Sequence, residues 1–226
     1  MIQAVIFNLD GVLVNSDECQ FAAWRQLAHE QGIPFDEKIN GSMQGMKRME
    51  SLRVLLRKAE RRYTMGEMFA LSARKNDIFN ELILTLGPEN ICPGAVDAVE
   101  ELREIGIKTA VGSCSENATG ILRQLKMDRL FDVIVDGGQI TKGKPDPEVF
   151  LLAADQMEVP PENCLVVEDG RPGVEAARRC GMQVLAIGDA LSSVNADYWA
   201  ESVRSADLPD IIRRDYVRTE ESKNME

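Results

Sequence analysis

The chain has 226 residues, which is enough for one large domain or for a core with a modest insertion. Hydrophobic residues make up 44% and charged residues 28%, a globular balance that excludes a disordered or collagen-like chain. The 26 Lys and Arg residues face 37 Asp and Glu residues, so the formal charge is −11. We therefore expect no nucleic-acid or anionic-membrane surface, because both need clustered cations.

The same survey predicts a cytoplasmic monomer. No apolar run approaches the roughly 20 residues of a membrane helix. The first apolar stretch carries Asp10 and has no basic segment before it, which is unlike a signal peptide. The five cysteines are odd in number and scattered, and no pair has CxxC spacing, which favours reduced thiols in the cytosol. The net charge fits a monomer.

The first half of the chain reads as one strand followed by helices. Residues 2–7 are mostly apolar and predict a buried strand, which ends at the turn signal of residues 8–11. Residues 17–31 place apolar side chains at helical spacing, with Ser16 as a plausible N-cap and Gly32 as a plausible stop. The pattern stays helical to about residue 85, without a convincing strand.

The second half of the chain alternates between strand-like and helix-like patterns. Strands are predicted over 107–112, 132–136, 164–169 and 182–188, and helices over 94–105, 116–125, 146–157 and 173–180. Alternation with apolar strands indicates an α/β fold with a parallel sheet covered by helices. The first strand has no local partner, so we interpret the helical block, residues 15–87, as an insertion into a core made of residues 1–14 and 88–226. The polar end, residues 218–226, is expected to be frayed.

Polar side chains follow the predicted strands where each strand ends. In an open parallel sheet, ligands bind outside these carboxyl ends. Each residue alone has an ordinary explanation as a turn, a helix cap or a solvated loop residue, but together they form an ordered set. Oxygen-rich clusters suit Mg²⁺, and an ammonium group suits a phosphate. The residues are Asn8 and Asp10, then Ser113, Ser115 and Asn117, then Lys144, and finally Glu168 and Asp169.

These motifs resemble those of the haloacid dehalogenase-like phosphotransferases, within them the β-phosphoglucomutase-like group. The matching stretches are IFNLDGVL (6–13), VGSCSEN (111–117), GKPDPEVF (143–150) and VVEDGRPGVEAARRCGM (166–182), together with FAAW (21–24), QGMKRMESL (44–52) and RKND (74–77) in the inserted block. The resemblance covers nearly the whole chain. It implies a Rossmann-like core with residues 15–87 as a helical cap.

The resemblance also implies roles for residues. Position 8 would carry the nucleophile that forms an aspartyl-phosphate, Asp10 would be the general acid/base, and Ser113 and Lys144 would hold the transferring phosphoryl group. Mg²⁺ would be bound by the side chain at position 8, the Asp10 carbonyl and Asp169, with Glu168 in support. The residues that would contact the rest of the substrate are Arg48, Ser115, Asn117, Gln20 and Lys75.

The chain departs from the family pattern at position 8, where Asn stands in place of Asp. An amide is a poor nucleophile and removes one negative ligand from the metal. An engineered trapping substitution, a natural pseudoenzyme and a sequence error each explain it. Glu116 stands where the mutase group tends to carry Lys, and an acid there would repel a phosphate. Gln20 replaces a His of close mutase relatives.

The expected function is that of a Mg²⁺-dependent phosphatase or sugar-phosphate mutase acting on a small phosphorylated metabolite. With Asn8 we expect it to be inactive or trapped. The alternative is a non-catalytic protein, a pseudoenzyme, that binds the same phosphometabolite.

Overall fold

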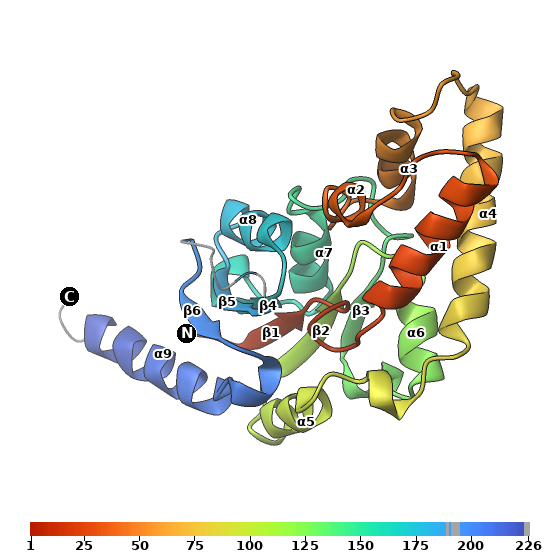
Figure 1. Ribbon diagram of the computed structural model, residues 1–226. Helices are drawn as coiled ribbons and strands as arrows, with labels where there is room; N and C mark the ends of the chain where they lie inside the picture. Colours follow the sequence, from red (N-terminus) through yellow and green to blue (C-terminus); the bar gives the residue numbers. More distant parts are fainter. Residues whose placement is uncertain (189, 191–194, 224–226) are drawn as a thin grey trace.

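A computed structural model gives the fold and describes residues 1–188, 190 and 195–223. At its centre, these residues form a sheet of six parallel strands in the order β3-β2-β1-β4-β5-β6 (Figure 1). The predicted α/β class with a parallel-sheet core is therefore confirmed. The strands are β1 (Ala4–Phe7), β2 (Lys108–Gly112), β3 (Val133–Val135), β4 (Cys164–Glu168), β5 (Gln183–Ile187) and β6 (Tyr198–Ala200).

Strand β1 lies in the middle of the sheet because all four of its residues are apolar and are completely buried. Phe7 is paired with Val111 of β2 on one side and with Val167 of β4 on the other. The pairing with β4 continues into Asn8, whose backbone N–H donates to the Val167 carbonyl at 3.0 Å. The residues that follow these three strands therefore meet at one edge of the sheet.

Helices cover both faces of the sheet. They are α5 (Ala95–Glu104), α6 (Ala118–Gln124), α7 (Glu148–Gln156), α8 (Arg171–Arg179) and α9 (Leu208–Lys223), with short 3₁₀ helices η1 (Pro88–Asn90), η2 (Asp128–Leu130), η3 (Pro161–Asn163) and η5 (Val203–Ser205) in the connections. Val5 and Phe7 pack in one core with α5, α6 and α9, whereas Ile6 packs in the other with α7 and α8. The figure shows α5 and α9 on the opposite side of the sheet from α7 and α8 (Figure 1).

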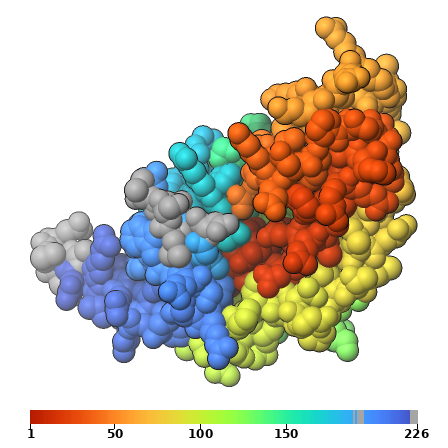
Figure 2. All heavy atoms as spheres, viewed as in Figure 1, coloured from red at the N-terminus to blue at the C-terminus, as the bar shows by residue number. Residues whose placement is uncertain are grey.

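Four α-helices lie between β1 and η1 in the chain. They are α1 (Asp17–Glu30), α2 (Glu37–Gly41), α3 (Arg48–Leu56) and α4 (Met65–Ile83). Residues 15–87 are all described and contain no strand. Helix α4 packs against both α1 and α3, and Leu27, Leu55 and Phe79 are completely buried among them. This block forms the upper right part of the molecule, coloured red to yellow (Figure 2).

The sequence analysis did not predict strand β6 or helix α9. Strand β6 has three residues at the edge of the sheet, and Trp199 is 51% exposed, so no apolar pattern marks it. The expectation of a frayed end was wrong for residues 218–223, which belong to α9; residues 224–226 lie outside the described part. One reason is Asp215, whose carboxylate accepts hydrogen bonds from the backbone N–H of Ile2 (2.7 Å) and from Gln183 (2.8 Å), tying α9 to the sheet.

No helix among the described residues is long and apolar enough to cross a membrane. All five cysteines are free of disulfides, as the sequence analysis expected.

Candidate active site

A cavity of about 370 Å³ opens where the carboxyl edge of the sheet faces the helices of residues 17–83. Its size falls within the roughly 300–1,000 Å³ of small-molecule sites. Every residue that the sequence analysis assigned to a site lines it, although their roles stay predictions. They are Asn8, Asp10, Gln20, Arg48, Lys75, Ser113, Ser115, Asn117, Lys144, Glu168 and Asp169.

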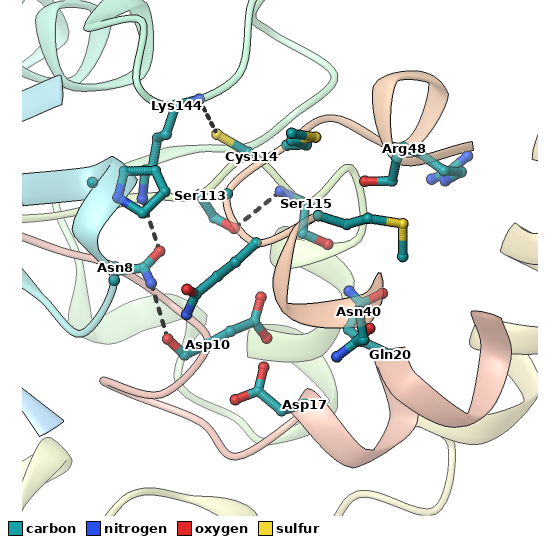
Figure 3. Close-up of a pocket in the computed structure, with 18 of the residues that line it drawn as sticks. Asn8, Asp10, Asp17, Gln20, Asn40, Arg48, Ser113, Cys114, Ser115 and Lys144 are labelled. Atoms are coloured by element: carbon teal, nitrogen blue, oxygen red, sulfur yellow. Dashed lines mark hydrogen bonds between the residues drawn. The ribbon is translucent and has the colours of Figure 1, made fainter. Parts of the chain in front are cut away.

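Asn8 is at the centre of a hydrogen-bond network at one end of the cavity (Figure 3). Its amide nitrogen, Nδ2, donates to the Asp10 carbonyl oxygen and to Asp169 Oδ1, both at 2.9 Å. Its amide oxygen, Oδ1, accepts from Lys144 Nζ, also at 2.9 Å. Both protons of the amide and its oxygen are therefore engaged by groups from three separate stretches of the chain.

Lys144 is a buried cation paired with a buried carboxylate. Its Nζ lies 2.6 Å from Glu168 Oε1 and donates to the Gly112 carbonyl at 3.1 Å, in addition to its bond with Asn8. Burial lowers the pKa of Lys144, but Glu168, Cys114 and Asp169 together outweigh it, so the pKa is raised and the ammonium stays charged. The other oxygen of Glu168 accepts from the backbone N–H of Gly170 at 3.1 Å. Glu168 thus supports Lys144 and does not face the cavity as a free ligand.

Asp10 is the second carboxylate of the site. Its Oδ1 accepts a hydrogen bond from the Ser16 hydroxyl. Burial, followed by repulsion from Asp17, raises the pKa of Asp10 to about 6. A group with this pKa exchanges protons near neutral pH, which is the property that a general acid or base needs.

Asp169 follows β4 and lies against the turn after β1. Burial and the neighbouring Glu168 raise its pKa to about 8. The backbone of Gly11, with φ of +73°, passes so close that a Cβ there would lie 2.0 Å from Asp169 Oδ2. Only glycine permits this approach of the turn to the carboxylate.

The residues present do not fit the Mg²⁺ that the family resemblance implies. Two suitable oxygens, Asp169 Oδ1 and the Asp10 carbonyl, point at one place, but the Asn8 nitrogen fills it. An amide N–H group donates hydrogen bonds and does not bind a cation. Turning the amide over would place its N–H groups against the Lys144 ammonium, donor against donor.

The loop after β2 forms the middle and far end of the cavity. The Ser113 hydroxyl accepts from the backbone N–H of Ser115 at 3.1 Å. Asn117 donates from its side chain to Asn76 Oδ1 of α4 at 2.9 Å. Glu116 Oε2 lies 3.1 Å from the Arg48 guanidinium of α3. The loop therefore joins the sheet edge to two helices of the inserted block.

Lys75 and Gln20 form the wall between these ends. Lys75 Nζ donates to Gln20 Oε1 and lies over the rings of Phe79 (4.3 Å) and Trp24 (5.0 Å). Burial, followed by repulsion from Arg48, lowers the pKa of Lys75 to about 7.

Two residues of the site were missed or assigned another role. Ser16 does lie at the N-cap position of α1, but its side chain makes no cap hydrogen bond and instead donates to Asp10. Asp17 lines the cavity, although in the sequence it looks like an ordinary acid in the first turn of a helix. Their nearness to Asp10 in the chain was the only available signal.

Comparison with known proteins places this geometry in context. Residues 2–181 match the family model of the haloacid dehalogenase-like hydrolases. The chain is 39% identical over 198 residues to the β-phosphoglucomutase of Bacillus subtilis, covering 87% of this chain and 88% of that protein. It is 34% identical over 185 residues to the phosphorylated carbohydrates phosphatase of Thermotoga maritima, covering 80% and 83%. The crystal structure of a β-phosphoglucomutase from Clostridium difficile matches with a TM-score of 0.90 and 32% identity, over 96% of this chain and 99% of that one.

Proposed function

The chain belongs to the haloacid dehalogenase-like hydrolases, in their β-phosphoglucomutase-like group, and we propose that its cavity binds a small phosphorylated metabolite, a sugar phosphate. The similarity places it among enzymes of the phosphatase and phosphomutase type. One observation carries the proposal: side chains from distant stretches converge on Asn8 within 2.9 Å. Two similar proteins act on phosphorylated sugars according to their names, which agrees with it.

We assign the end of the cavity at Asn8 to the phosphoryl group. The buried Lys144 ammonium and the Ser113 hydroxyl supply positive charge and a hydrogen-bond donor, which is what a phosphoryl group requires. Asp10 is our candidate for the acid that protonates the leaving oxygen, and its pKa of about 6 supports that role. At the other end, Arg48, Ser115 and Asn117 are candidates for contacts with the rest of the substrate.

The Asn8 protein should bind this substrate without turning it over. Its amide cannot become an acyl phosphate, so the covalent route has no nucleophile. We propose that Mg²⁺ binds only when position 8 carries a carboxylate, because the Asn8 amide turns N–H groups, and not an oxygen, toward Asp169 and the Asp10 carbonyl. A protein that only senses the metabolite remains the alternative.

We further propose that residues 15–87 act as a cap over the core made of residues 1–14 and 88–226. A hydrogen bond and an ion pair already link the two parts, through Asn76 with Asn117 and Arg48 with Glu116. A cap that closes over the site would exclude water from the phosphoryl group. A monomeric state and a cytoplasmic location also stay proposals.

Calorimetry on the Asn8 protein tests the binding step. The ligands titrated into the protein are glucose 1-phosphate, glucose 6-phosphate, fructose 1-phosphate and the corresponding free sugars. Lys144→Met is the site variant and Lys142→Met is its exposed control. We expect binding of at least one ester, none of the free sugars, and loss of binding in Lys144→Met only. Equal affinity for an ester and its free sugar would refute a phosphoryl site. Binding that persists while the variant Asn8→Asp gains no turnover would favour the non-catalytic alternative.

A further inference from the structure

The far end of the cavity holds a cation that is already neutralised. Arg48 begins α3, and its guanidinium lies 3.1 Å from Glu116 in the loop after β2. The Arg48 side chain is 14% exposed, whereas that of Glu116 is 38% exposed. Figure 3 shows Arg48 on the other side of Ser115 from Asn8, so this pair lies away from the end that we assign to the phosphoryl group.

An anionic group on the far end of a substrate would need this guanidinium. Arginine is the side chain best suited to hold a phosphate, through parallel N–H bonds. Here Glu116 takes that place as a resident anion. A second phosphate would have to displace the carboxylate and would then lie beside it, two like charges in one partly buried cavity.

The other charges of the cavity do not reverse this balance. In the described part, the lining includes the acids Asp10, Asp17, Glu37, Glu116, Glu168 and Asp169 but only the bases Arg48, Lys75 and Lys144. Lys144 is paired with Glu168 at the opposite end, and Lys75 is directed to Gln20 and two aromatic rings. No cation of the lining is left to attract a second phosphate.

We propose that Glu116 makes this site selective for phosphate monoesters whose far end carries hydroxyl groups and no second phosphate. The inference rests on the proposed function and names its substrate class. The hydroxyls of such a substrate can donate to Glu116 and accept from Arg48 without breaking the charge balance. A bisphosphate of the same sugar meets the same phosphoryl end but is repelled at the other.

The test compares two ligands that differ by one phosphate. Fructose 1-phosphate and fructose 1,6-bisphosphate are titrated calorimetrically into the Asn8 protein at constant ionic strength. The variants are Glu116→Gln and Glu116→Ala, and the matched control is Glu104→Gln, which removes one charge from an exposed position of α5 outside the cavity. We expect the monophosphate to bind about tenfold or more tightly than the bisphosphate. Either variant at Glu116 should lower the bisphosphate Kd about tenfold and so close the gap, whereas Glu104→Gln should leave the ratio unchanged.

Three results would overturn the inference. If the bisphosphate binds the Asn8 protein as tightly as the monophosphate, or if the variants at Glu116 change both affinities equally, then Glu116 does not set the selection and the phosphoryl site itself still stands. If neither ester binds any form of the protein, the proposed function fails and the inference fails with it.

Discussion

The variant Asn8→Asp replaces one N–H₂ group by an oxygen at the most connected point of the site. In the Asn8 protein, the amide donates to Asp169 Oδ1 and to the Asp10 carbonyl, each at 2.9 Å. Losing these two hydrogen bonds costs about 2 kcal/mol. The new carboxylate also faces Asp169. Above the Asp169 pKa of about 8, where both groups are charged, two unit charges 2.9 Å apart repel by about 6 kcal/mol at an effective dielectric of about 20. Attraction to Lys144 Nζ at the same distance offsets that repulsion.

Without a divalent cation, we therefore expect Asn8→Asp to be destabilised by about 2 kcal/mol, the two lost hydrogen bonds. With Mg²⁺, the oxygen that replaces the amide nitrogen would join Asp169 Oδ1 and the Asp10 carbonyl oxygen as possible ligands of the ion. At a concentration one hundred times the Kd, binding stabilises the folded state by about 2.7 kcal/mol. For a chain of this size, that corresponds to a rise in Tm of roughly 5–10 °C.

The assay is thermal unfolding with and without excess MgCl₂. The Asn8 protein should show no shift in Tm, and Asn163→Asp, the same substitution at η3 outside the cavity, should behave like it. In the Asn8→Asp variant, hydrolysis of sugar monophosphates should rise by about three orders of magnitude or more. Free phosphate should be the product. Transfer to a second sugar phosphate would make a bisphosphate, which we propose that Glu116 repels. The reasoning is wrong if MgCl₂ raises the Tm of the Asn8 protein as much as that of the variant.

Three further changes probe the buried charges. Lys144→Met leaves the Glu168 carboxylate buried without its partner and should lower the free energy of unfolding in urea by about 3–5 kcal/mol. Lys142→Met, on the exposed surface, should lower it by less than about 1 kcal/mol. Similar losses for both variants would contradict the burial argument. Gly173→Ala should unfold the protein or displace Glu168, because its Cβ would lie 1.9 Å from Glu168 Oε1, and an unchanged melting curve would disprove the contact. The pKa of Lys75 is lowered from 10.5 to about 7, so between pH 7 and pH 10.5 the unfolded state binds more protons than the folded state. The free energy of unfolding should therefore increase as the pH rises through that window. Lys75→Met should remove this increase, and an increase that persists in the variant would belong to another group.

The strand-end residues could be predicted because parallel strands share one carboxyl edge. Asn8, Lys144 and Asp169 are far apart in the chain, but each follows a strand or its loop, so topology alone brings them together. The direction of each hydrogen bond could not be predicted. That the Asn8 nitrogen faces Asp169 and its oxygen faces Lys144 depends on where the charges lie in three dimensions.

Contacts between the inserted block and the sheet edge were even harder to predict from the sequence. The sequence shows Arg48 as a possible phosphate contact and Glu116 as a departure from the family, but nothing in it states that the two pair with each other. Such a pair spans separate elements, α3 and the loop after β2, and apolar periodicity does not fix how two elements lie relative to each other. Strand β6 was missed for a related reason, since three residues at an edge carry no pattern.

The central position of β1 in the sheet has a consequence for folding during synthesis. The first strand to leave the ribosome is paired with β2 and β4, so it has no partner strand until about half of the chain has been synthesised and lacks the second until about three quarters. Helices α1 to α4 can meanwhile assemble from local contacts. A newly made chain thus carries a folded helical block beside a bare hydrophobic segment, the kind of surface that chaperones shield.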